Sequence, residues 1–91
     1  MDPQIAERAN QALVAFLRAE LQLGFTYLRT ARVEASIDSE GEKRARELAT
    51  DALETIERFL PRITDPAIQE EFRKDARKLE GLVSASRTTS L

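Results

Sequence analysis

The sequence contains no cysteine, no histidine and no tryptophan among its 91 residues. Without cysteine the chain can form no disulfide bond, bind no zinc through thiolates and use no thiol nucleophile. Without histidine it lacks the commonest general base and the commonest metal ligand. We therefore expect a protein that is not an enzyme and that needs no metal or other cofactor.

The sequence also lacks a large excess of positive or negative charge, and it lacks a long uninterrupted apolar segment. Lys and Arg number 14, Asp and Glu number 16, and the net charge is −2. Such a chain has no global attraction for nucleic acid or for an anionic membrane. The most apolar stretch, residues 12–28, is interrupted by Arg18 and Glu20, which argues against a membrane span. Residues 1–4 are too polar for a signal peptide, so we expect a cytoplasmic protein.

Glycine and proline are scarce, with three of each, and they fall mostly at the boundaries of predicted helices. Asp2 is the expected N-cap of a first helix that begins at Pro3 and runs to about Ala35. After a short connection, Ser39 and Glu42 have the spacing of a capping box and predict the start of a second helix.

The second helix is expected to end at about Leu60, because Pro61 cannot continue it. The Asp65-Pro66 pair repeats the start signal of the first helix and predicts a third helix to about Ser84. The sequence thus predicts a single helical domain over residues 1–84 and a flexible polar tail over 85–91.

The second and third helices each carry one apolar stripe at helical spacing, whereas the first is apolar around most of its circumference. The stripe of the second helix consists of Ala45, Leu48, Ala49, Ala52, Leu53, Ile56, Phe59 and Leu60. The narrow polar strip of the first helix consists of Gln4, Gln11, Arg18, Gln22, Thr26 and Arg29. These patterns predict an all-α, antiparallel, up-down-up three-helix bundle with a long first helix as its central element.

The first helix has more apolar surface than two one-sided companions can cover. It is also longer than the second helix, so its first turns should extend beyond that helix. A second copy of the chain, related by a two-fold axis, could cover the remainder, which predicts a homodimer. The alternative is a closed monomeric bundle with a few exposed Leu and Phe side chains.

Around the first hairpin, some residues match a known motif. Leu23-Gly24 followed by Tyr27 has the form Leu-Gly-x-x-Tyr, and further along the chain stand Ala49, Leu53 and Pro61. This pattern resembles a tetratricopeptide (TPR) repeat, whose second helix carries Ala, Phe and Pro. In that family the glycine lets two helices approach closely and the proline stops the second helix. The resemblance covers residues 20–61 and implies a hairpin that binds a protein or peptide.

The sequence also departs from the TPR pattern. About thirteen extra residues separate Tyr27 from Ala49, and Glu20 stands where the family has a tryptophan. Ile56 replaces a preferred alanine, and only one such unit is present where about three are usually needed for stability. Since about thirteen residues add close to two turns to each helix, the same faces would still meet.

Glu20 falls in the middle of the apolar face of the first helix. An ionised carboxylate in such a place must be paired, protonated or close to water. As a functional residue, Glu20 would contact a ligand or set the register of the helices. As a structural residue, it would pair with an arginine or with Tyr27, or reach water at one end of the bundle. The candidate interaction or buried polar site comprises Glu20, Tyr27, Gly24, Phe16 and Phe25.

The functional prediction is a non-enzymatic helical module for protein–protein interaction or self-assembly. The alternative is a helical bundle that binds a small molecule or an anion through Glu20, Tyr27 and a nearby arginine. Arg58 and Arg62, together with Arg29 or Arg32, could form a second basic cluster, but the sequence does not place them relative to one another. A basic ridge on the third helix is interleaved with acids, which favours an ordinary solvated face.

Overall fold

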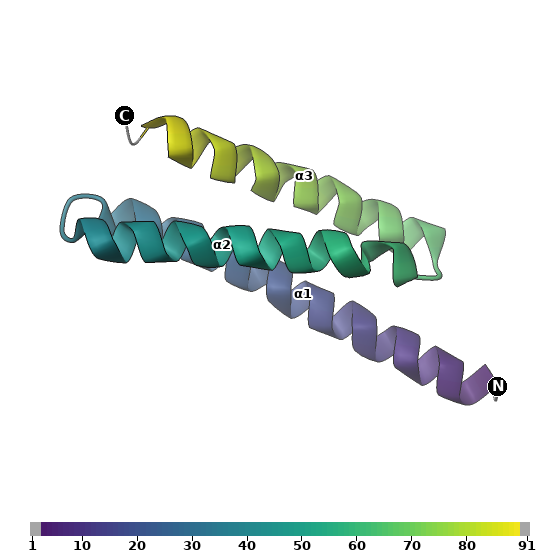
Figure 1. Cartoon of the computed structure of the whole chain (residues 1–91). Helices are drawn as coiled ribbons and strands as arrows, with labels where there is room; N and C mark the ends of the chain where they lie inside the picture. Colours follow the sequence, from purple (N-terminus) through teal and green to yellow (C-terminus); the bar gives the residue numbers. More distant parts are fainter. Residues whose placement is uncertain (1–2, 90–91) are drawn as a thin grey trace.

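The computed structural model describes residues 3–89 of the chain, with side chains up to Ser86. This part forms three α-helices, α1 (Pro3–Glu34), α2 (Ser39–Phe59) and α3 (Pro66–Thr89), with a 3-10 turn, η1 (Leu60–Arg62), after α2. Figure 1 shows α1 and α2 as an antiparallel hairpin, with α3 running back along it. The expected all-helical, three-helix architecture is confirmed for these residues.

The molecule is elongated, measuring 52 × 18 × 15 Å along its principal axes. At about 1.5 Å per residue, the 32 residues of α1 span about 48 Å. Figure 1 shows the purple N-terminal half of α1 diverging from α3. Ile5, in this half, is 60% exposed. The first turns of α1 are therefore poorly covered, as its length predicted.

The core lies where the three helices meet. Its largest fully buried side chains come one from each helix: Leu17, Ile56 and Leu79. The other buried apolar residues of this cluster are Ala49, Leu53, Leu60, Ile63, Phe72, Ala76 and Val83. Ala49, Leu53 and Leu60 belong to the predicted stripe of α2, so the 3-and-4 spacing located the core correctly on this helix.

The start of α2 differs from the predicted capping box. Asp38, not Ser39, is the N-cap: its backbone is extended, and its side chain accepts a hydrogen bond of 3.1 Å from the backbone N–H of Glu40. Ser39 is already the first residue of the helix. Asp and Ser are about equally good N-caps, so the sequence alone could not choose between the neighbours. The N-cap predicted for α1, Asp2, lies outside the described residues.

The start of α3 is as predicted. The carboxylate of Asp65 accepts hydrogen bonds from the backbone N–H groups of Ala67 (2.9 Å) and Ile68 (3.5 Å). The end of α3 differs, because the helix continues from the expected end near Ser84 to Thr89. A guanidinium N–H of Arg46 on α2 donates to the carbonyl of Ser86 at 3.4 Å and so holds this end of α3 against α2.

The expectation that the first helix is the central element is wrong within one chain. Only Leu17, Gly24 and Ala31 of α1 are buried, whereas α2 buries five residues. The reason is that α3 packs along one side of the hairpin instead of wrapping around α1. Consequently α1 keeps apolar side chains in contact with solvent.

Gly24 marks the closest approach of the helices. A Cβ atom added at this position would lie 2.6 Å from Cδ2 of Leu79 on α3 and 3.6 Å from Cβ of Ala52 on α2. The first distance is shorter than real Cβ contacts, and Leu79 is fully buried, so its side chain has little room to move. Gly24 is thus needed for packing rather than for backbone flexibility, and α1 continues through it as a helix.

Two glycine-to-alanine substitutions should therefore have opposite effects on stability. A Cβ atom added at Gly81, on α3, would have no atom within 4 Å, so Gly81→Ala should gain about 0.5–1 kcal/mol from helix propensity alone. Gly24→Ala has the same propensity gain but overpacks Leu79, at a cost of about 1–3 kcal/mol. Urea unfolding followed by circular dichroism measures both, and a Gly24→Ala protein as stable as Gly81→Ala would contradict the close approach.

Candidate interaction surface

Three contacts fix how α1 lies against α2. Phe16 meets Phe59, Gly24 lies against Ala52, and a Cβ at Gly41 would lie 3.1 Å from the carboxylate of Glu34. All three contacts belong to one antiparallel register, in which residues later in α1 lie opposite residues earlier in α2. The same register places Glu20 opposite the turn that contains Thr55.

The seam between these helices is made largely of small residues. Buried in or beside it are Gly24, Ala31, Ala45, Ala49 and Ala52. Small residues let two helix backbones come close together, and they leave little room in the seam for large side chains. Leu17 and Ile56 are buried together with these small residues, and the other large apolar side chains of α1 and α2 lie on the two flanks of the seam.

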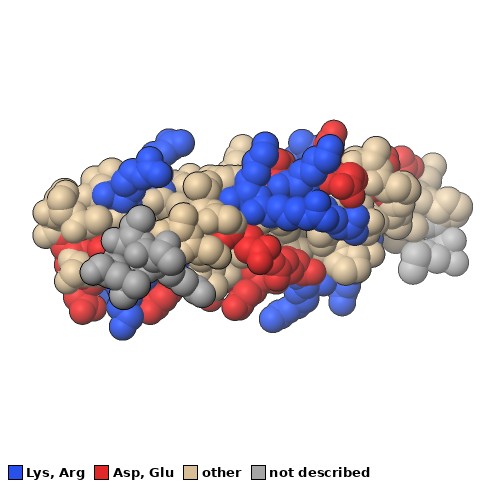
Figure 2. All heavy atoms as spheres, turned by 90° about the horizontal axis from the view of Figure 1, so that it is seen from above, with Lys and Arg blue, Asp and Glu red and all other residues tan. Residues whose placement is uncertain are grey.

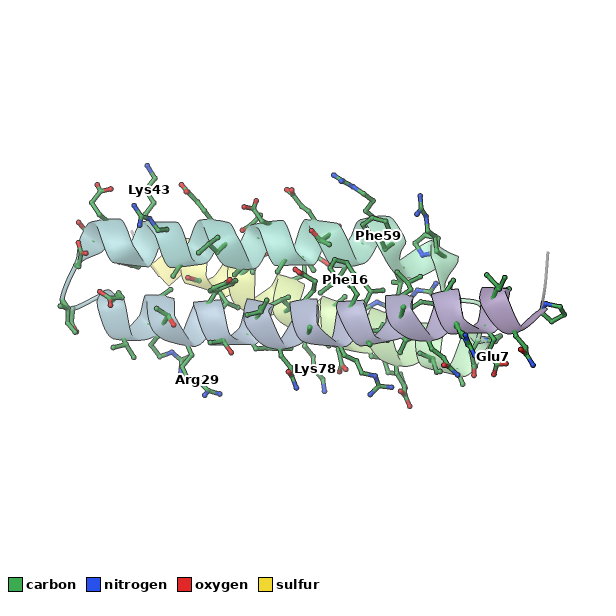
Figure 3. The ribbon with its side chains drawn as sticks, turned by 90° about the horizontal axis from the view of Figure 1, so that it is seen from below. Glu7, Phe16, Arg29, Lys43, Phe59 and Lys78 are labelled. Carbon is green, nitrogen blue, oxygen red and sulfur yellow. The ribbon has the colours of Figure 1, made fainter. Side chains whose placement is uncertain are left out.

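One flank of the seam faces α3 and the other does not. At about 100° per residue, Phe16 and Leu23 lie within about 20° of each other on α1, and Phe25 lies about 160° from Leu23. Phe25 lines a groove together with Leu82 of α3, so it is on the covered flank. Phe16 and Leu23 are consequently on the flank away from α3. Figure 3 views the molecule from this side, with α3 behind α1 and α2.

The flank away from α3 also includes residues of α2. Phe59 contacts Phe16, and Leu48 lies on the same side of α2 because eleven residues bring a helix back to within about 20°. We call this flank the open face, defined by Phe16, Glu20, Leu23, Tyr27, Leu48 and Phe59. Phe16 is 44% exposed, Leu23 41% and Leu48 38%, although all three are large and apolar. Glu20, Tyr27 and Phe59 are half-buried.

An aromatic cluster closes one end of the open face. The rings of Phe16 and Phe59 meet edge to face, with centroids 6.1 Å apart and an interplanar angle of 85°. The guanidinium of Arg62 lies 4.9 Å from the centroid of the Phe59 ring. Figure 3 shows Phe16 and Phe59 between the two helices. Edge-to-face pairs contribute about 0.5–1.5 kcal/mol beyond area burial, so this contact fixes the orientation of both rings.

Glu20 on the open face has no hydrogen bond or ion pair with any of the residues that the structure describes. Its carboxylate is not fully buried. Within residues 3–86, the one fully buried side-chain nitrogen or oxygen without a hydrogen-bond partner is Nε of Arg46. Glu20 therefore reaches water at the edge of the seam. Of the possibilities that the sequence left open, this is the one the structure favours within a single chain.

The five residues proposed from the sequence do not form one site. Phe16, Glu20 and Tyr27 lie on the open face, Gly24 is buried in the seam, and Phe25 lies on the flank towards α3. Sequence reasoning missed the contribution of α2 to the open face, namely Leu48 and Phe59. The sequence analysis assigned both residues to the buried stripe of α2. They lie at the edge of that stripe, and residues at an edge are buried only where a neighbouring helix extends over them.

The groove beside Phe25 contains the nearby arginines that the sequence could not place. It lies between the end of α1, the start of α2 and the last turns of α3, and Arg29 and Arg32 line it. Arg58 and Arg62 lie at the opposite end of α2, so the four arginines do not converge. Glu20 and Tyr27 do not line this groove. An anion site that combines them with Arg29 or Arg32 is therefore not assembled here.

Charges on α3 are mixed in sign, as the interleaved sequence predicted. Arg73 pairs with Glu70 at 2.8 Å, and Lys78 lies 4.0 Å from Asp75. Figure 2, which looks onto α3, shows Lys and Arg beside Asp and Glu on one surface. In the described part of the chain no cluster of three acidic side chains could hold a metal ion. Nor does any helix there have the length and apolar character needed to cross a membrane.

Comparison of the chain with protein-family models, with curated protein sequences and with solved structures found no match.

Because Glu20 reaches water without a partner, removing its charge should matter little. We expect Glu20→Gln to change the free energy of unfolding by less than about 0.5 kcal/mol, as for other surface substitutions. Glu20→Leu should be tolerated equally well, because it extends the apolar surface around it. Urea denaturation of both variants measures this. A loss of several kcal/mol in Glu20→Gln would mean instead that the carboxylate is paired in the folded protein.

Proposed function

We propose that this chain is a non-enzymatic helical interaction module that self-associates through the open face. The observation that carries this is the exposure of Phe16, Leu23 and Leu48 on one flank of one hairpin. Single exposed apolar residues are common on protein surfaces, but a contiguous group is typical of an interaction site. These three side chains share their flank with half-buried Tyr27 and Phe59, so the apolar side chains form one group around Glu20.

The energetic reason for association is the exposed area. Full burial of a Leu or Phe side chain contributes about 1.5–3 kcal/mol, so covering the remaining two-fifths contributes about 1 kcal/mol for each. A two-fold interface uses the same surface twice and therefore covers six such side chains at once. Two phenylalanines and a tyrosine on this face are residue types that are enriched in interfaces.

The charges at the two ends of the open face favour a second copy as the partner. Arg62 lies over Phe59 at one end, and Glu34 lies at the other end, on the same side of α1 as Phe16. If two copies pair with their α1 helices antiparallel, Arg62 of each copy approaches Glu34 of the other. Opposite charges at both ends favour this orientation over the parallel one, in which like charges meet.

The resemblance to a TPR hairpin supports an interaction role, since that family binds proteins and peptides. The part of the resemblance that matters physically is Gly24, which brings α1 close to its neighbours. A partner protein could occupy the open face in the same way as a second copy does. We favour the second copy, because the chain itself supplies both the apolar surface and the complementary charges.

A second carboxylate on the open face, next to Glu20, should prevent self-association. Glu20 and Leu23 are three residues apart on α1, so Leu23→Asp would place two like charges side by side in the interface, where both would lose their hydration without gaining a partner. Val33, 57% exposed on the same helix but about 80° away from Leu23, provides the matched control Val33→Asp. We expect light scattering at high micromolar concentration to give a dimer for the wild type and for Val33→Asp, and a 10.3 kDa monomer for Leu23→Asp.

Circular dichroism checks in parallel that Leu23→Asp remains helical, as expected for a residue that is already partly exposed. A wild type that is monomeric at the same concentration would rule out self-association. Equal dissociation of both variants would show that the interface lies elsewhere.

A further inference from the structure

The groove on the other flank of the hairpin has a different chemical character from the open face. It has a volume of about 530 Å³ and lies where α1 ends, α2 begins and α3 passes over both. Its apolar lining residues are Phe25, Leu28, Ala31, Ala35, Leu82 and Ala85. The volume is within the range of about 300–1,000 Å³ that is usual for small-molecule sites.

Two cations border this apolar groove without a partner. Arg29 and Arg32 are both exposed, and neither forms a hydrogen bond or an ion pair with the residues that the structure describes. They are three residues apart on α1 and therefore adjacent on its surface. Arg32 is in the last turn, where a cation also compensates the negative end of the helix dipole. That role requires only one cation and leaves the guanidinium groups free to bind a ligand.

Among the described residues that line the groove, the acidic one, Glu42, is already paired. Glu42 lies 3.6 Å from a guanidinium nitrogen of Arg46, and another nitrogen of Arg46 donates to the carbonyl of Ser86 on α3. This bridge fixes the α2–α3 side of the groove and offsets the charge of Glu42. Among the described charged residues that line the groove, Arg29 and Arg32 are thus the two whose charge is not offset, which favours an anion as the ligand.

We propose that the groove binds an amphipathic carboxylate, a carboxylate group attached to a medium-length apolar chain. The carboxylate is bound by Arg29 and Arg32, whose planar guanidinium groups can each donate two parallel hydrogen bonds to it. The apolar chain lies along Phe25, Leu28 and Leu82. Leu82 is a large apolar residue that is 44% exposed, and a bound apolar chain would reduce this exposure.

The groove and the open face are separable in experiments. Phe25 and Phe16 lie on opposite sides of α1, so a ligand in the groove does not touch the surface proposed for self-association. The binding test is therefore independent of whether the chain forms a dimer.

The probe is sodium decanoate, used below its micelle concentration, with decanol and sodium acetate as comparison ligands. Calorimetry measures the affinity, and methyl NMR shifts report where the ligand lies. We expect decanoate to bind with shifts at Leu28 and Leu82, and to bind at least about tenfold more tightly than decanol or acetate. The double variant Arg29→Gln/Arg32→Gln should weaken decanoate binding about tenfold.

The matched control is Arg8→Gln/Arg58→Gln, which removes the same charge from exposed positions away from the groove. Decanoate should bind to this control as it does to the wild type. Equal weakening in both double variants would overturn the proposal, because it would reduce the effect to net charge. Decanol binding as tight as that of decanoate, or shifts at Leu23 and Leu48 instead of Leu28 and Leu82, would overturn it as well.

Discussion

The close approach of α1 and α2 through small residues is the constraint on which the rest of the structure depends. Gly24 fits between Ala52 and Leu79 with no room for a side chain, and alanines line the seam on either side of it. A seam this narrow buries Leu17 and Ile56 but cannot accommodate all the other large apolar residues that both helices carry. These residues are forced onto the two flanks, so the hairpin has two apolar faces instead of one.

The third helix can cover only one of these faces. It supplies Phe72, Leu79 and Val83 to the core and leaves Phe16, Leu23 and Leu48 exposed on the other side. Where α3 lies over the end of the hairpin, its coverage leaves a groove bordered by arginines. The two surfaces thus have one origin but different chemistry: the open face is mostly apolar, with Glu20 within it and charges at its ends, and the groove combines an apolar lining with two cations.

Much of the fold could be predicted from the sequence, because its signals are local. Asp65 with Pro66 and the single stripe of α2 determine their elements through neighbours only a few residues away. The sequence could not decide between Asp38 and Ser39 as N-cap, because their capping preferences are nearly equal. It also grouped Phe25 with Phe16, and it overestimated the burial of α1. Both errors have the same cause: a helical wheel shows that a face is apolar, but the placement of α3 determines whether that face is covered.

The most direct test measures how accessible the open face is as the protein concentration rises. Because the chain has no cysteine, Leu23→Cys and Val33→Cys each introduce a single thiol whose alkylation rate reports local exposure. We predict that both thiols react readily in dilute solution and that only the thiol at position 23 becomes protected at high concentration. Equal reactivity at the two positions over the whole concentration range would contradict an open face that is covered by a second copy of the chain.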